Sequence, residues 1–212
     1  MAKIDKEFFD INEGIKANKV EDLLGEDEEV LLRLKPNKKD FILEAIFKGL
    51  PVALIWGGFD AFFIFMLVSS GALKEMGFMA LFIVGFFFIH LFPVWMYVAN
   101  IVKKVASYKN VEYVFTDKRI IIRSGVIVDY KMLYYADISS VVVKVGLWDR
   151  LFKVGDLHIT TINQNAVLED IESPYQYGDK IQEIVRDLKA DMQFPNDLRP
   201  EENHGYNTKY KK

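Results

Sequence analysis

The sequence has no cysteine, and it has only three histidines and six prolines among its 212 residues. The lack of cysteine excludes disulfide bonds, thiolate zinc sites and cysteine nucleophiles, and it suits a soluble part that faces a reducing cytosol. His90, His158 and His204 are far apart in the sequence, so no two of them have the spacing of metal ligands. Glycine-rich phosphate loops and the Gly-x-Ser-x-Gly motif are also missing. We therefore expect no enzyme, no catalytic residues, no metal site and no cofactor.

An excess of positive charge is missing as well. Lysine and arginine together number 27, against 30 aspartate and glutamate residues, which gives a net charge of −3. No block of lysine and arginine shows the interleaved aromatic residues of a nucleic-acid-binding surface. Nucleic acid is therefore not expected as a partner. The length leaves room for one small domain beside the long apolar segments.

Two long apolar stretches, residues 49–73 and 77–102, lie between charged segments. About 20 apolar residues in a helix cross the hydrocarbon core of a bilayer, and both stretches reach that length. The first of them begins too deep in the chain to be a cleavable signal peptide. The pattern predicts a transmembrane helical hairpin over residues 48–102, with a tight joint at residues 71–77.

Lysine side chains gather on one side of this predicted hairpin. They precede the first stretch and follow the second: Lys35, Lys38, Lys39, Lys48, Lys103, Lys104 and Lys109. The positive-inside bias places both termini in the cytoplasm, so we expect a multi-pass protein of the cytoplasmic membrane. Residues 1–47 are predicted to be a cytoplasmic segment that ends in an interfacial helix. Asp40 is the expected N-cap of that helix, and Gly49 and Pro51 are expected to redirect the chain into the membrane.

Each apolar stretch carries one ionisable residue, Asp60 in the first and His90 in the second. A carboxylate at the bilayer centre costs about 2.5 to 3.5 kcal/mol, so Asp60 should face protein. Helical spacing puts it on the face of Ala53 and Gly57, which let another helix approach. Counted outward from the joint, Asp60 and His90 lie at similar depths, so we expect hydrogen-bonded partners. Two interpretations stay open: a polar clasp or oligomer contact, and a site that handles protons or ions.

After residue 103 the pattern changes from helical to strand-like. Six short runs rich in β-branched and aromatic residues alternate with turns, at 111–116, 119–124, 126–131, 140–145, 157–162 and 166–170. Apolar side chains at helical spacing follow up to residue 192. The pattern predicts an α+β domain over residues 103–192, an antiparallel β-barrel of six or seven strands with one C-terminal helix. The polar residues 193–212 are predicted to form a disordered tail.

Three segments carry a resemblance to a known family: 113–126, 135–143 and 147–161. Their turn and core positions are similar to those of the bacterial pleckstrin-homology-like (bacterial PH) domain, in the membrane-anchored form with two transmembrane helices before the domain. The acidic-to-apolar segment 25–36 resembles the lead-in of those proteins. The resemblance implies a PH-like fold on a membrane hairpin, and it implies no particular activity. Lys153 stands where the family usually has glycine.

Two groups of residues in the predicted domain are candidates for contacts. Lys118, Arg119 and Arg123 lie near the first strand turn and are candidates for contact with anionic lipid headgroups; the alternative is an ordinary solvated strand face. Trp148 and Arg150 are candidates for a contact with a protein partner, because tryptophan and arginine are enriched at interface hot spots. The alternative for Trp148 is that it closes the open end of the barrel.

These observations favour an integral membrane protein whose cytoplasmic PH-like domain binds a protein partner, or copies of itself, at the inner leaflet without catalysis. The lipid bilayer is then its other partner. Two alternatives belong to different classes. One is a small subunit of a transport or export assembly in which Asp60 and His90 handle charge. The other is a membrane sensor that binds anionic lipid.

Overall fold

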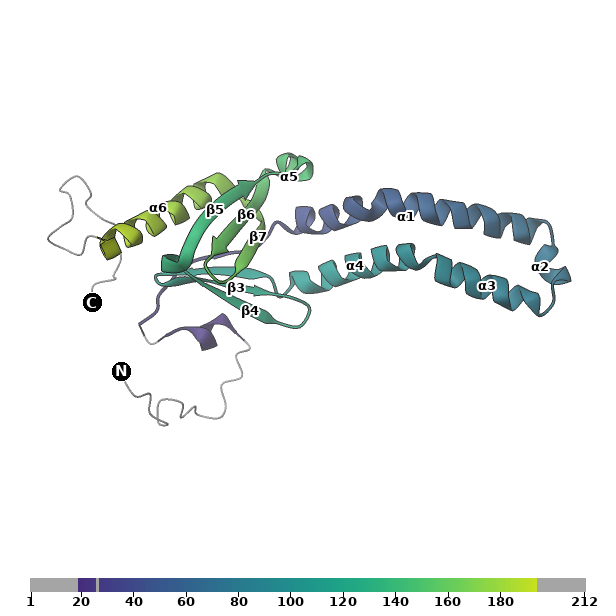
Figure 1. Ribbon diagram of the computed structural model, residues 1–212, viewed down its shortest axis with the longest axis horizontal. Helices are drawn as coiled ribbons and strands as arrows, with labels where there is room; N and C mark the ends of the chain where they lie inside the picture. Colours follow the sequence, from purple (N-terminus) through teal and green to yellow (C-terminus); the bar gives the residue numbers. More distant parts are fainter. Residues whose placement is uncertain (1–18, 26, 194–212) are drawn as a thin grey trace, which may run out of the picture.

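The computed structural model describes residues 19–25 and 27–193, which form a long helical arm and an α+β domain at its base (Figure 1). In chain order the elements are η2 (Val20–Leu23), β1 (Val30–Leu34), α1 (Lys38–Ser69), α2 (Ala72–Glu75), α3 (Met79–His90), α4 (Phe92–Tyr108), β2 (Glu112–Thr116), β3 (Arg119–Ser124), β4 (Asp129–Tyr134), η3 (Tyr135–Asp137), β5 (Ile138–Lys144), α5 (Leu147–Phe152), β6 (Val154–Thr161), β7 (Asn165–Glu172) and α6 (Pro174–Gln193). The tail predicted for residues 193–212 lies, apart from Gln193, outside the described residues.

The arm consists of α1 running outward and of α3 and α4 running back beside it (Figure 1). Gly71 and Gly77 flank the short helix α2 with φ angles of 73° and 52°, a left-handed conformation that glycine adopts at no steric cost. By length and composition, α1 is the one single helix within residues 19–25 and 27–193 that is able to span a membrane. Helices α3 and α4 meet the same criterion only as a pair, which is bent by 48°. Pro93 follows the bend and has no N–H to continue the helical ladder.

Helix α1 corrects the prediction of a separate interfacial helix that is capped by Asp40 and ends at Gly49 and Pro51. The N-cap is Asn37, whose side chain accepts a hydrogen bond from the Lys39 N–H at 3.1 Å, and the helix continues through both residues. Contact with α4 explains why residue 49 is glycine. A Cβ at Gly49 would lie 2.6 Å from the Tyr97 ring, so glycine is needed there for close packing. The Tyr97 hydroxyl also donates to the Ile46 carbonyl at 2.9 Å.

The strands form two antiparallel sheets, in the orders β1-β2-β3-β4 and β5-β6-β7. The α+β class, the antiparallel pairing and the C-terminal helix are as predicted, but the described strands do not close into one barrel. The turn η3 separates β4 from β5 where Tyr135 enters the core and its hydroxyl donates to the Thr116 carbonyl at 3.0 Å. Both sheets and α6 share one apolar core, which Phe41 of α1 also joins.

The domain takes residues from both sides of the arm. Strand β1 pairs with β2, so the chain leaves the domain after β1, forms the arm and returns at β2. The predicted range 103–192 therefore lacks the first strand of the domain, which came from the segment 1–47. Both ends of the arm are joined to neighbouring strands of one sheet, so its base is held at two points.

Candidate functional site

The structure brings Asp60 and His90 together inside the arm. The His90 Nδ1 atom lies 2.8 and 3.0 Å from the two carboxylate oxygens of Asp60, whose side chain is only 1% exposed. In the tautomer with hydrogen on Nδ1, the imidazole N–H donates a hydrogen bond to the carboxylate. The Trp56 indole N–H donates to the His90 carbonyl at 2.7 Å, and the rings of Trp56 and Phe86 stack on the imidazole. The pair is therefore a polar contact surrounded by aromatic rings.

The local structure explains how this contact forms. His90 is the last residue of α3, directly before the bend that Pro93 follows. Gly57 lies one turn before Asp60 and faces Val94 of α4, with no side chain to keep the helices apart. The small face of α1 and the bend of its partner thus place the imidazole opposite the carboxylate.

The three basic residues predicted as headgroup contacts do not form one cluster. Lys118 and Arg119 lie at the β2–β3 turn, at the opposite end of β2 from α4. Arg123 lies near the arm, opposite Glu112 in the register of β2 with β3. Arg119 is a structural residue: its guanidinium donates to both carboxylate oxygens of Glu28, at 2.8 and 2.7 Å, and to the Leu23 carbonyl. These contacts engage the Arg119 side chain within the protein, which leaves it less free to meet a lipid headgroup.

This contact lowers the pKa of the Glu28 carboxyl group. Burial on its own raises the pKa of Glu28, but hydrogen bonds from Arg119, the Gly25 N–H and the Thr116 hydroxyl outweigh it and lower the pKa to about 2. Glu28 therefore stays ionised at neutral pH and ties the segment before β1 to β3.

Trp148 lies on α5 and stacks on Phe47 of α1, with 4.3 Å between the ring centroids. It therefore packs against the base of the arm and does not close the end of a barrel. Arg150 is exposed on the same helix. Leu147 and Leu151 of α5 are 85% and 69% exposed, so this short helix presents an apolar surface beside the arm (Figure 1).

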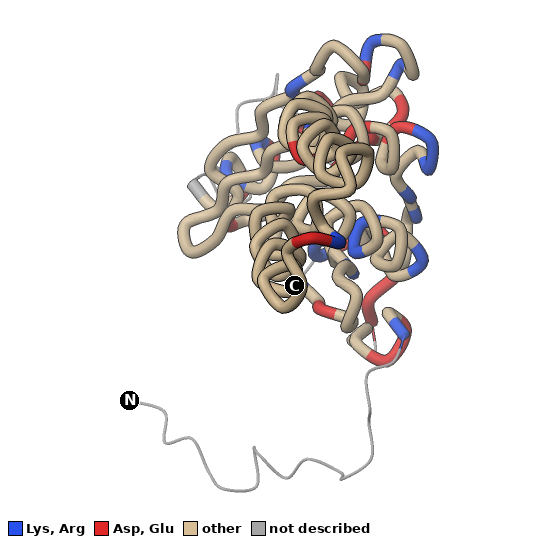
Figure 2. The backbone as a smooth tube through the Cα atoms, turned by 90° about the vertical axis from the view of Figure 1, so that its right-hand side faces the viewer, with Lys and Arg blue, Asp and Glu red and all other residues tan. Residues whose placement is uncertain are grey.

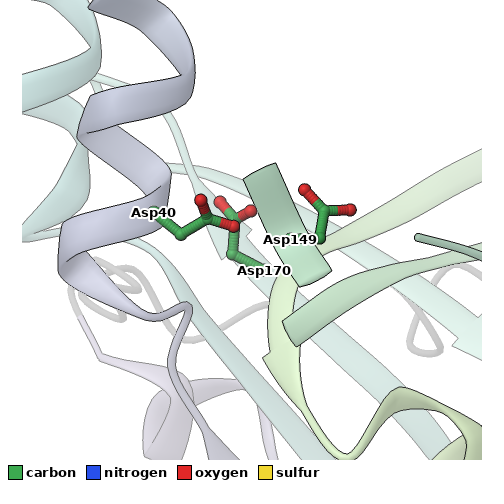
Figure 3. A group of neighbouring side chains, drawn as sticks. All are labelled: Asp40, Asp149 and Asp170. Atoms are coloured by element: carbon green, nitrogen blue, oxygen red, sulfur yellow. The ribbon is translucent and has the colours of Figure 1, made fainter. Parts of the chain in front are cut away.

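Three aspartates that the sequence pattern does not bring together form a cluster in the structure: Asp40, Asp149 and Asp170 (Figure 3). They come from α1, α5 and β7, all three are buried, and one carboxylate oxygen from each lies within 4.8 Å of the others. The N–H of Asn37, the N-cap of α1, donates to the Asp170 carbonyl at 2.9 Å. The cluster thus sits where the arm begins. No spacing in the sequence predicts it, because the three residues belong to three distant elements.

The electrostatics of this cluster are unfavourable to three negative charges. Burial raises the pKa of Asp170, and the neighbouring charges of Asp40 and Asp156 raise it further. Burial also raises the pKa of Asp40. The nearby cation Lys104 contacts Glu169 at 2.5 Å and lies over the Phe41 ring, so its charge is shared with other groups.

The family model described as "Bacterial PH domain" matches residues 51–192 of the chain. The match begins within α1 and ends in α6, so it includes most of the arm together with β2–β7. No curated protein and no solved structure matches the chain.

Proposed function

The chain belongs to the bacterial PH domain family, and from this premise we propose that it is a non-catalytic integral membrane protein. Its arm spans the bilayer as a hairpin, and its PH-like domain binds a protein partner or other copies of itself at the cytoplasmic face. The family suggests an interaction module, and the observation that carries the membrane assignment is the exposure of the arm. In an apolar stretch of 18 residues within α1, only 6% of the residues are buried inside the protein. Soluble monomers rarely expose apolar patches of more than a few hundred Å².

The distribution of charge supports the same placement. Between residues 49 and 102 of the arm the only lysine or arginine is Lys74 at the joint, whereas charged residues surround the arm on the domain, as the view along the arm from its tip shows (Figure 2). Lysines 103 and 104 lie near the base of α4, where the positive-inside bias expects them. Tyr97 and Trp95 also lie on α4, between these lysines and the bend, and such rings favour the headgroup zone.

Two apolar elements flank the base of the arm and support a domain seated against the leaflet. One is α5, with its exposed leucines. The other is the β3–β4 turn, where Ile127 is 84% exposed and where Asn110, just after α4, donates to the carbonyls of Gly125 and Val126. Apolar side chains that lie at the boundary between the lipid headgroups and the acyl chains insert there at little cost.

The orientation is tested with single cysteines, which have no background in a chain without cysteine. We expect Lys74→Cys, at the joint, to react with a membrane-impermeant maleimide in intact spheroplasts. Asp179→Cys, exposed on α6, should react only after lysis. The reverse labelling pattern, or equal labelling of both before lysis, would contradict the proposed topology.

A groove between β1 and α6 is where we expect the partner contact. It has a volume of about 470 Å³ and is lined by Leu31, Tyr177, Lys180 and Ile184 among others. A photo-crosslinking residue in place of Lys180 should give a discrete adduct in native membranes. The same residue in place of Asn163, exposed at the β6–β7 turn, is the matched control. Monomer alone from both positions would argue against an interaction at this groove.

The contact between Asp60 and His90 favours a second candidate function, a subunit of a transport assembly, because intramembrane ionisable groups often mark ion pathways. Two spans enclose no pathway without further subunits. The third candidate, sensing of anionic lipid, is weakened because Arg119 is bound to Glu28.

A further inference from the structure

Asp40 is a buried carboxylate without a hydrogen-bond donor. Its side chain is 0% exposed, and within the described part of the chain neither of its oxygens accepts a hydrogen bond from an N–H or hydroxyl group; the carboxyl group of Asp170 is its polar neighbour. Oδ2 of Asp170, a residue that is 2% exposed, likewise accepts no such hydrogen bond within the described part. Buried charges in proteins are normally paired or bound to a metal, because leaving them bare is costly. These oxygens therefore point to a ligand.

The backbone holds Asp170 in a conformation that aims its side chain at α1 (Figure 3). Gly155 pairs with Ile171 but Leu157 pairs with Leu168, so β7 has one extra residue, a β-bulge, at this point. Asp170 has a φ of 54°, a left-handed conformation that aspartate tolerates better than most residues. Its N–H donates to Asp156 and its carbonyl accepts from Asn37. The peptide groups on both sides of the side chain are thus fixed.

Asp149 completes the set from the third element. Its Oδ2 accepts a hydrogen bond from the Gly146 N–H at 2.6 Å, which fixes the side chain at the start of α5. Asp156, Glu44 and Glu169 add further negative charge nearby, and Lys104 contacts Glu169. The neighbourhood therefore has more carboxylates than cations to balance them.

We propose that Asp40, Asp149 and Asp170 bind a divalent cation of the size of Ca²⁺, which fixes the first turn of α1 to α5 and β7. Carboxylate oxygens are the ligands that hard cations prefer. Ca²⁺ binds oxygens at about 2.3–2.6 Å, so ligand atoms up to about 5 Å apart fit one ion, whereas Mg²⁺, at about 2.0–2.1 Å, needs them closer. One carboxylate oxygen from each of the three residues lies within 4.8 Å of the others, so the three are close enough to share one such ion. The sequence predicted no metal site because it offered no ligand spacing.

The cation would join the arm to the domain at a place where the chain already crosses between them. The cluster lies beside the N-cap of α1, and the same turn places Phe41 in the domain core. An ion at this point would therefore couple divalent-cation concentration to the rigidity of the base of the arm. This role is independent of which protein, if any, binds the groove at α6.

The test uses the full chain in detergent, treated with EDTA and then titrated with Ca²⁺ or Mg²⁺. We expect Ca²⁺ at a hundredfold excess over its Kd to raise Tm by about 5–10 °C. Calorimetry should show Ca²⁺ binding at least tenfold tighter than Mg²⁺. Asp40→Asn should lose at least tenfold in Ca²⁺ affinity, while Asp179→Asn, an exposed acid on α6, should keep the wild-type response.

The variant has a second signature, which a residue with a purely structural role would not give. In EDTA, Asp40→Asn should melt no lower than the wild type, because the amide removes repulsion between unpaired carboxylates. Asp170→Asn serves as the second variant if Asp40→Asn does not fold. A wild-type Tm that ignores Ca²⁺, equal shifts in all variants, or Mg²⁺ binding as tight as Ca²⁺ would overturn the proposal. Stabilisation by low pH alone, without a cation response, would assign the site to a shared proton and also overturn it.

Discussion

Arg119→Ala is expected to destabilise the domain by about 3–5 kcal/mol, because it removes one partner of a buried ion pair and leaves the other charge bare. The Glu28 side chain is only 2% exposed, so its charge depends on partners within the protein, and Arg119 is its cationic partner. The substitution also removes the hydrogen bond to the Leu23 carbonyl, which helps to hold the segment before β1. Denaturant unfolding of the detergent-solubilised protein, followed by far-UV circular dichroism, measures the change.

Arg123→Ala is the matched control for this prediction. Arg123 lies on the same strand, and its buried Nε has no hydrogen-bond partner within the residues that the structure describes. Its removal should change the free energy of unfolding by less than about 1 kcal/mol. Equal losses in the free energy of unfolding for the two variants would show that the contact with Glu28 adds no stability of its own.

Acid unfolding gives a second readout of the same ion pair. Because the folded pKa of Glu28 is lowered from 4.5 to about 2, its contribution is fully present above pH 4.5 and is lost as pH falls toward 2. Glu28→Gln should lack this part of the pH dependence. An identical acid limb in the variant and the wild type would contradict the assignment.

The sequence predicted those features whose causes are local. Strands β2 and β3 were found because β-branched residues alternate with turns, and α6 was found from its helical spacing. Asp60 and His90 were paired by counting residues from the joint, since a helix has a fixed rise. Strand β1 was not predicted, because the charged segment 25–36 shows no clear alternation of apolar and polar residues. Only its pairing with the distant strand β2 identifies it as a strand.

The remaining features depend on contacts between distant segments. Arg119 and Glu28 are 91 positions apart, so no window of sequence shows that they meet. The Asp170 carboxylate is aimed by a bulge that only the pairing of β6 with β7 creates. Lys153 adopts a left-handed φ of 58°, a conformation that favours the glycine usual at this position in the resembled family. In this chain the end of α5 imposes that conformation on a lysine. Such positions are fixed by tertiary structure, which overrides local preference.

His90→Ala is expected to weaken the association of α1 with α3 and α4 by about 2–3 kcal/mol, because it leaves the Asp60 carboxyl buried among apolar side chains without its partner. Asp60→Asn should cost less than about 1 kcal/mol, since an amide keeps a hydrogen bond to the imidazole and carries no charge. The double variant should then be more stable than His90→Ala alone. Unfolding in mixed micelles of rising SDS fraction measures all three.

The same variants separate the clasp from the transport interpretation. A clasp acts through packing, so proton flux into proteoliposomes, followed with a pH-sensitive dye, should stay near background for the wild type and for every variant. A group on an ion pathway acts through its charge, so Asp60→Asn would abolish flux although the hairpin remains folded. Weakened association without flux therefore supports the clasp. A wild-type flux that Asp60→Asn removes, at unchanged stability, would instead make the carboxylate of Asp60 the functional group.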